Sequence, residues 1–244
     1  MKWLVVVASL AVLVGCSSGQ DRNSPLARPE NMRVIDAAIT NGLPQTALAL
    51  TRRMLQGDPR SVDALLRQGD ALMAMGQPDA AEECYRRVLE VQAQSADALR
   101  GLGRARLAMG QAKEAETAFR KAIEHAPDAA TLNNLGIALD LQDRHDEAQA
   151  AYQAALTRRP SMTAAQVNLG LSLALAGATD RALAILQPLA NDPTANGRIR
   201  QDLAVALALA GDEAQARKVL SGELPQDGIA TALAGYAALK LSAK

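Results

Sequence analysis

The sequence predicts an all-α fold, a right-handed superhelical solenoid of about six helix pairs with one more helix at the C-terminus. A turn residue, usually glycine, recurs at gaps of 34, 34, 33, 34 and 34 residues. An alanine follows each turn residue after five positions, and apolar residues between the turns recur at helical spacing. The turn residues are Gly42, Gly76, Gly110, Asp143, Gly177 and Gly211, and the alanines are Ala47, Ala81, Ala115, Ala148, Ala182 and Ala216.

Each unit reads as two helices joined at the turn residue. In the third unit Leu99 and Leu102 share one face of the first helix, Gly110 ends it, and Ala115 and Phe119 share a face of the second. Glycine suits this turn because a helix often ends on a left-handed residue, and aspartate tolerates that conformation better than most residues do. Prolines that end helices stand near the predicted ends of second helices, at Pro59, Pro127, Pro160 and Pro193.

Two segments carry a resemblance to a known family: ALRGLGRARLAMGQAKEAETAFRKAIEHAP and TLNNLGIALDLQDRHDEAQAAYQAALTRRP. Both resemble tetratricopeptide repeats, which implies a solenoid over residues 32–223, with a leading helix over Met32 to Asn41. The last unit departs from the pattern at Ala204, where other units carry Gly69, Gly103, Gly136 and Gly170. Residues 224–244 place Ile229, Leu233 and Tyr236 at helical spacing, which predicts a helix that caps the last pair. The alternative for this segment is a frayed tail.

The N-terminus has the layout of an export signal. Lys2 precedes an apolar run that is too short to span a membrane, and polar residues follow from Ser17. The boundary Leu13-Val14-Gly15-Cys16 resembles a bacterial lipobox, which implies removal of residues 1–15 and acylation of Cys16 on its sulfur. Ser17 instead of aspartate then implies sorting to the outer membrane, facing the periplasm. The alternative is an ordinary secretory signal with an incidental cysteine.

Residues 16–31 are polar, contain two prolines, and are predicted to be a flexible tether. Without residues 1–15 the chain has 25 basic and 26 acidic residues, so it has no cationic excess to attract nucleic acid. Aromatic residues make up 2% of the sequence, too few to stack bases along a strand. Nucleic acid is therefore not expected as a partner.

Residues that could carry chemistry are scarce. His125 and His145 have no second ligand at metal spacing and are expected on the solvated surface, and no phosphate-binding glycine loop occurs. The pairs Glu82 with Glu83 and Glu114 with Glu116 read as solvated surface carboxylates. We therefore expect no catalytic residue, metal, cofactor or small-molecule substrate. Cys84 is expected to be a buried packing residue, the alternative being an exposed redox thiol.

A repeat solenoid offers a concave surface, lined by the first helix of each pair, that can hold a helix or an extended segment of another protein. The family register predicts a groove lined by Leu66, Asp70, Met73, Arg100, Arg104, Leu107, Asn133, Asn134, Ile137, Asp140, Val167, Asn168, Leu171, Gln201 and Val205.

Asn134 and Asn168 stand where some tetratricopeptide proteins hold a bound peptide backbone, although Arg67, Gly101 and Asp202 occupy the equivalent positions of other units. The alternative is that both asparagines cap or solvate their own helices. Arg100 and Arg104 have no basic partner in the next unit, so a basic clamp for a C-terminal carboxylate is not expected.

The segment RQDLAVALALAGDEAQARKVL, followed by Leu-Pro and a helix with one tyrosine, resembles the lipoprotein family of the tight-adherence (Flp) pilus assembly system. Ala232 departs from the asparagine common at that position of the family. The resemblance implies an outer-membrane accessory factor, whose partners are pilus secretion components, above all the secretin. Two alternatives remain: a pilotin of the type IV pilus, and an adaptor lipoprotein that docks periplasmic proteases or cell-wall hydrolases.

Overall fold

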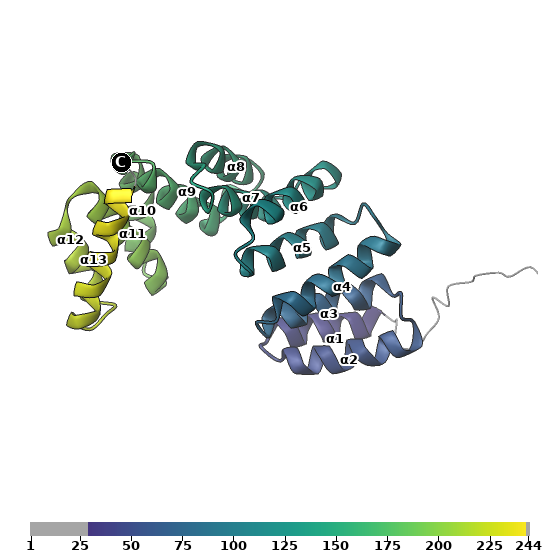
Figure 1. Ribbon diagram of the computed structural model, residues 1–244. Helices are drawn as coiled ribbons and strands as arrows, with labels where there is room; N and C mark the ends of the chain where they lie inside the picture. Colours follow the sequence, from purple (N-terminus) through teal and green to yellow (C-terminus); the bar gives the residue numbers. More distant parts are fainter. Residues whose placement is uncertain (1–28, 243–244) are drawn as a thin grey trace, which may run out of the picture.

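The computed structural model describes residues 29–242, which form thirteen α-helices and no strand. The helices follow one another as antiparallel pairs along an arc (Figure 1), which confirms the predicted all-α superhelical repeat. The bounds are α1 Pro29–Thr40, α2 Pro44–Gly57, α3 Val62–Ala74, α4 Pro78–Val91, α5 Ala96–Ala108, α6 Ala112–His125, α7 Ala129–Asp140, α8 His145–Arg158, α9 Thr163–Leu175, α10 Thr179–Asn191, α11 Gly197–Ala210, α12 Glu213–Leu220 and α13 Gln226–Ser242.

The first helix begins earlier than expected. The sequence predicts residues 29–31 as part of the tether, but α1 starts at Pro29. Proline is well tolerated in the first turn of a helix because the N–H that it lacks would have no partner there. The predicted signal peptide over residues 1–15 and the lipidation site at Cys16 lie outside the described residues.

The turns between the two helices of each pair have the conformation that the sequence predicts. All five turn glycines have positive φ, and Asp143 takes the same left-handed conformation with φ 58°. At Gly211, where φ is 91°, the backbone N–H bonds the carbonyls of Leu207 and Ala208 and so ends α11. Each turn therefore reverses the chain at the predicted residue.

In the four pairs from α3 with α4 to α9 with α10, a large side chain of the second helix faces a glycine of the first helix. A Cβ added at Gly103 would lie 2.5 Å from the Phe119 ring, and one at Gly136 would lie 2.4 Å from the Tyr152 ring. The large residues recur in register as Tyr85, Phe119, Tyr152, Leu186 and Leu220, all fully or almost fully buried. We call these large residues the bulky column, and the facing residues Gly69, Gly103, Gly136 and Gly170 the glycine column. The glycine column marks the places where two helix backbones and a bulky side chain meet.

The first pair reverses this arrangement of large and small residues. Ile35 of α1 stands in register with the glycine column and Thr51 of α2 with the bulky column, and both are fully buried. The Thr51 hydroxyl donates to the Ala47 carbonyl at 2.9 Å, so its polar atom is satisfied inside its own helix. The same space is thus filled from the first helix instead of the second.

Two acidic residues expected on the solvated surface are buried instead. Glu82 and Glu116 are 9% and 8% exposed. Arg106 of the next pair reaches Glu82 at 3.3 Å, and Arg144, just before α8, reaches Glu116 at 2.7 Å. A buried carboxylate is tolerated when it is paired and hydrogen-bonded, so these two glutamates join consecutive pairs.

Replacing Glu116 with glutamine is expected to lower the free energy of unfolding by about 1 to 3 kcal/mol near neutral pH, the usual cost of breaking a charged hydrogen bond. Burial acts to raise the pKa of Glu116, but hydrogen bonds from Gln142 and Arg144 outweigh it and hold the pKa below its usual value. The ionised form therefore stabilises the fold above the unfolded-state pKa of about 4.3, and this contribution is lost as the pH falls through the lower folded-state pKa.

Urea unfolding of wild type and Glu116→Gln at neutral and acidic pH measures this effect. The gap between the two proteins is expected to shrink as the pH falls below about 4. A gap that stays constant with pH would contradict the ion-pair account. Glu114→Gln is the matched control, since Glu114 is exposed on the same helix.

Two further residues complete the description of the core. Cys84 is buried and its Sγ donates to Gln68 Oε1 at 3.3 Å. Burial raises the pKa of this thiol to about 11, so it stays protonated at neutral pH, which confirms the packing role. Helix α13 contacts α11 and α12, and its Leu233 is buried in register with Ala165 of α9. Helix α13 thus occupies the place of a seventh first helix.

Candidate partner-binding groove

The odd-numbered helices α1 to α13 form the inner side of the arc. Consecutive odd-numbered helices contact one another throughout the array, whereas no comparable contact joins consecutive even-numbered helices within residues 29–242. Elements on the inside of a curved array lie closer together than those on the outside, so the first helices line its concave face. We call this face the groove.

The predicted groove residues all come from these first helices, but they are not equally accessible. Asn133 and Val167 are only 5% and 8% exposed, so a partner would not reach them without rearrangement. The others are partly exposed, namely Leu66, Asp70, Met73, Arg100, Arg104, Leu107, Asn134, Ile137, Asp140, Asn168, Leu171, Gln201 and Val205.

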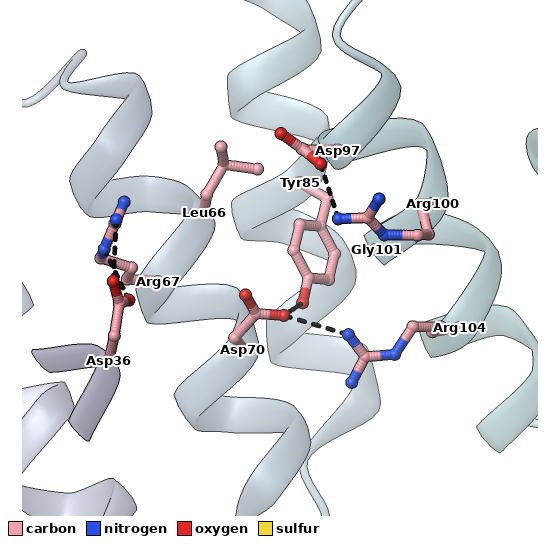
Figure 2. A pocket seen from close by; sticks show the side chains of 9 residues that line it. All are labelled: Asp36, Leu66, Arg67, Asp70, Tyr85, Asp97, Arg100, Gly101 and Arg104. Carbon is pink, nitrogen blue, oxygen red and sulfur yellow. Dashed lines mark hydrogen bonds and ion pairs between the residues drawn. The ribbon is translucent and has the colours of Figure 1, made fainter. Parts of the chain in front are cut away.

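A cavity of about 200 Å³ opens at the N-terminal end of the groove, between α1, α3 and α5 (Figure 2). Four predicted residues line it: Leu66, Asp70, Arg100 and Arg104. Sequence reasoning missed the other five, Asp36, Arg67, Tyr85, Asp97 and Gly101. We call this cavity the charged pocket.

Tyr85 reaches the charged pocket from a second helix. Its ring passes between two glycines, since a Cβ at Gly69 or Gly101 would lie 2.6 or 2.4 Å from it. The hydroxyl emerges on the groove side and donates to Asp70 Oδ1 at 2.8 Å (Figure 2). The signal in the sequence is Gly101, a glycine in a column where other units carry Arg67, Asn134 and Asn168.

Every arginine of the charged pocket already has a carboxylate partner. Arg67 Nε lies 2.9 Å from Asp36 of α1, and Arg104 lies 3.2 Å from Asp70 of α3. Arg100 lies 2.6 Å from Asp97 on its own helix and 3.4 Å from Asp128, the N-cap residue of α7. The pairs of Arg67 with Asp36 and of Arg104 with Asp70 bridge successive first helices. All of these pairs leave the pocket with donors and acceptors side by side instead of one net charge.

The middle of the groove carries amides instead of ion pairs. Asn168 Nδ2 donates to Asn133 Oδ1 at 2.9 Å, which joins α9 to α7. Neither Asn134 nor Asn168 caps a helix, because both lie within helices and the cap positions are Asp128 and Met162. Within residues 29–242 the Asn134 amide has no side-chain partner, so it can hydrogen-bond a ligand or water.

Asp140 lies at the loop end of α7 and is held by three donors. Its carboxylate accepts from the Tyr152 hydroxyl at 2.8 Å and from the Ser172 hydroxyl at 2.7 Å, and His145 Nδ1 lies 2.8 Å away. His145, expected on the solvated surface, is therefore partly buried in this cluster. Its role here is to position α8 against the end of α7.

Residues 29–242 contain no cluster of three or more histidine, cysteine, aspartate or glutamate side chains suited to a metal ion. None of the helices in this range has the length and hydropathy needed to cross a membrane.

The fold and the groove define a helical-repeat protein of the class that serves as a protein-protein interaction scaffold. The sequence model of the tetratricopeptide repeat family matches residues 66–130 and 133–196, so the chain belongs to that family. A search of curated proteins found no match.

Several solved structures share the fold. PilW, described as a widely conserved type IV pilus biogenesis factor, superposes with a TM-score of 0.71 at 18% identity, over 80% of this chain and 92% of that one. PilF of Pseudomonas aeruginosa gives a TM-score of 0.67 at 17% identity, over 80% and 90% of the two chains. MamA gives a TM-score of 0.55 at 24% identity, over 75% and 97%. At these identities the likeness shows the fold alone.

Proposed function

We propose that this protein is a non-enzymatic outer-membrane lipoprotein scaffold that assists assembly of the tight-adherence (Flp) pilus by binding the secretin or another pilus secretion component. The observation that carries the binding role is the groove, where paired charges at one end give way to amides and apolar side chains. This mixture suits a polypeptide segment, because it offers hydrogen-bond donors and acceptors beside apolar contacts.

The pilus assignment has two supports. The C-terminal segment from Arg200 to Leu220 resembles the Flp pilus lipoproteins in sequence. The fold is shared with PilW and PilF over four-fifths of this chain. PilW is described as a type IV pilus biogenesis factor, so a pilotin of the type IV pilus is the second candidate. Such a protein would act in the same way on a component of a different pilus.

The proposed anchor is the acylated Cys16, which would hold the solenoid at the periplasmic face of the outer membrane. Two or more acyl chains give stable membrane attachment, where one alone would be marginal. Only 12 residues, 17–28, separate Cys16 from the start of α1 at Pro29. Fully extended, they would span roughly 40 Å at about 3.3 to 3.6 Å each, so the groove would stay close to a membrane-embedded partner.

Replacing Arg100 and Arg104 together with glutamine is expected to reduce the amount of secretin retained by the purified protein by roughly tenfold or more, since each guanidinium offers charged hydrogen bonds to a partner. Both side chains are partly exposed and face the charged pocket (Figure 2). Glutamine is preferable to glutamate, which would set new carboxylates beside Asp70 and Asp97.

The measurement is co-purification of secretin from detergent-solubilised outer membranes, quantified against the wild type. The matched control is Arg181→Gln, since Arg181 is exposed on the second helix α10. Exposed ion pairs contribute at most about 1 kcal/mol each, so circular dichroism is expected to show folded protein in every variant. Unchanged retention of secretin by the double variant would exclude the charged pocket as its binding site.

A further inference from the structure

Asp202 lies near the C-terminal end of the groove, on α11. It belongs to a column of groove positions that recur every 33 or 34 residues, one on each first helix from α3 to α13. The members of this column are Arg67, Gly101, Asn134, Asn168, Asp202 and Tyr236. Asp202 thus follows Asn168 of α9 and precedes Tyr236 of α13 in the same line along the groove.

The Asp202 carboxylate differs from the other carboxylates of this face in having no partner. Asp70 accepts from Tyr85, Asp97 pairs with Arg100, and Asp140 has three donors. Asp202 is partly buried, yet within residues 29–242 no hydrogen bond or ion pair reaches its side chain. Burial raises the pKa of Asp202, and the positive charge of Arg198 opposes this only in part.

Among the side chains that the structure describes, Arg198 is the one charged group that acts on Asp202. The neighbouring groove positions on α9 and α11 hold Val167, Asn168, Leu171, Gln201 and Val205. Arg198 lies one turn earlier on α11, is exposed, and does not form an ion pair with Asp202 in the described residues. The Asp202 carboxylate therefore has no ion-pair partner among the described residues, and a bound cation would compete there with the exposed Arg198 alone.

Tyr236 of α13 adds an aromatic ring to the same place. Its side chain is partly buried and packs against the hydrophobic core, to which Leu203 and Leu207 of α11 belong. Tyr236 stands in register with Asp202 on the next first helix, and α13 contacts α11, so the two residues are neighbours in the column. Burial and the negative charge of Asp202 raise the pKa of Tyr236. A lysine or arginine side chain held by the carboxylate would thus also lie near an aromatic ring, a favourable pairing for a cation.

We propose that Asp202, flanked by Tyr236, anchors a lysine or arginine side chain of the protein segment that occupies the groove. The proposal rests on the proposed function, because it names the chemistry of the segment that the groove binds. A partly buried carboxylate without a partner costs free energy, and a cation from a partner removes that cost on binding. The bound segment is thus expected to carry one basic residue among uncharged residues. The site that holds this residue lies several repeats away from the charged pocket.

The test is selection of a random twelve-residue peptide library on the purified full chain in non-ionic detergent. Peptides selected on the wild type are expected to share one basic position, and Asp202→Asn is expected to bind them about ten- to hundredfold more weakly, the loss of one charged hydrogen bond. The matched control is Asp180→Asn, since Asp180 is exposed on the second helix α10. That variant is expected to bind the peptides as the wild type does.

Folding of the variant is checked separately. Because Asp202 has no partner to lose, Asp202→Asn is expected to keep or raise the midpoint of thermal unfolding, by up to roughly 3 °C. A lowered midpoint would show that the carboxylate is already paired within the fold and would overturn the proposal.

The outcomes of the selection separate the two claims. Selected peptides that bind wild type and Asp202→Asn equally, or that share no basic position, would overturn the Asp202 anchor and leave the groove as a binding surface. No selectable peptide on the wild type would overturn the peptide-binding function, and the anchor with it.

Discussion

Phe119→Ala is expected to lower the free energy of unfolding by about 3 to 5 kcal/mol, the usual cost of removing a buried aromatic ring. The Phe119 ring is fully buried, and it fills the space left by Gly103 on the facing helix. Because each repeat is stabilised only by its neighbours, a cavity in the third pair weakens the array at its centre. Urea unfolding followed by circular dichroism measures the loss.

A swap of large and small residues tests whether the glycine column and the bulky column are complementary. The first pair already has the reverse arrangement, with Ile35 on α1 and Thr51 on α2. Gly103→Ile alone overpacks the site and Phe119→Thr alone leaves a cavity. The double variant is expected to lose at least about 1 kcal/mol less than the sum of the single losses. Additive losses would contradict the complementarity.

Cys16→Ala is expected to move nearly all of the protein out of the outer-membrane fraction and to leave its N-terminal segment uncleaved. In the proposed lipoprotein the Cys16 sulfur carries the diacylglycerol, and without acyl chains no comparable membrane affinity remains. Fractionation of cells followed by mass spectrometry of the N-terminus measures both effects. The matched control is Cys84→Ala, because Cys84 is buried in the solenoid and its loss is expected to leave the protein at the membrane.

Normal processing and outer-membrane location of Cys16→Ala would exclude the lipoprotein assignment. That result would leave the solenoid and its groove unaffected, since neither involves residues before Pro29.

The fold could be predicted because its turns are determined locally. Gly42 and its equivalents take positive φ wherever the sequence repeats, and Asp143 does the same. The buried glutamates could not be predicted in this way. Glu116 stands two residues after the exposed Glu114. It is paired inside the fold with Arg144, which comes from the next repeat, 28 residues further on. Glu114 and Glu116 therefore look alike in the sequence, although only Glu116 lies inside an ion-pair network.

The groove was predicted less completely than the fold. The repeat register alone places the first-helix residues on one face. It does not show that Asn168 hydrogen-bonds Asn133 or that Val167 is buried. Tyr85 was missed because it reaches the charged pocket from a second helix, through a gap that Gly69 and Gly101 leave open. Such a contact depends on the packing of three helices, which a pattern within one helix does not contain.

The most direct test of the central claim is photo-crosslinking in living cells of the source organism, with a photoreactive amino acid in place of Ile137. Ile137 is a partly exposed residue of the groove on α7, and Gln153, exposed on the second helix α8, is the matched control position. The account predicts a crosslink from position 137 to the secretin or another pilus secretion protein, and none to that protein from position 153. A crosslink from position 137 to a protease or cell-wall hydrolase, or equal crosslinking from both positions, would contradict it.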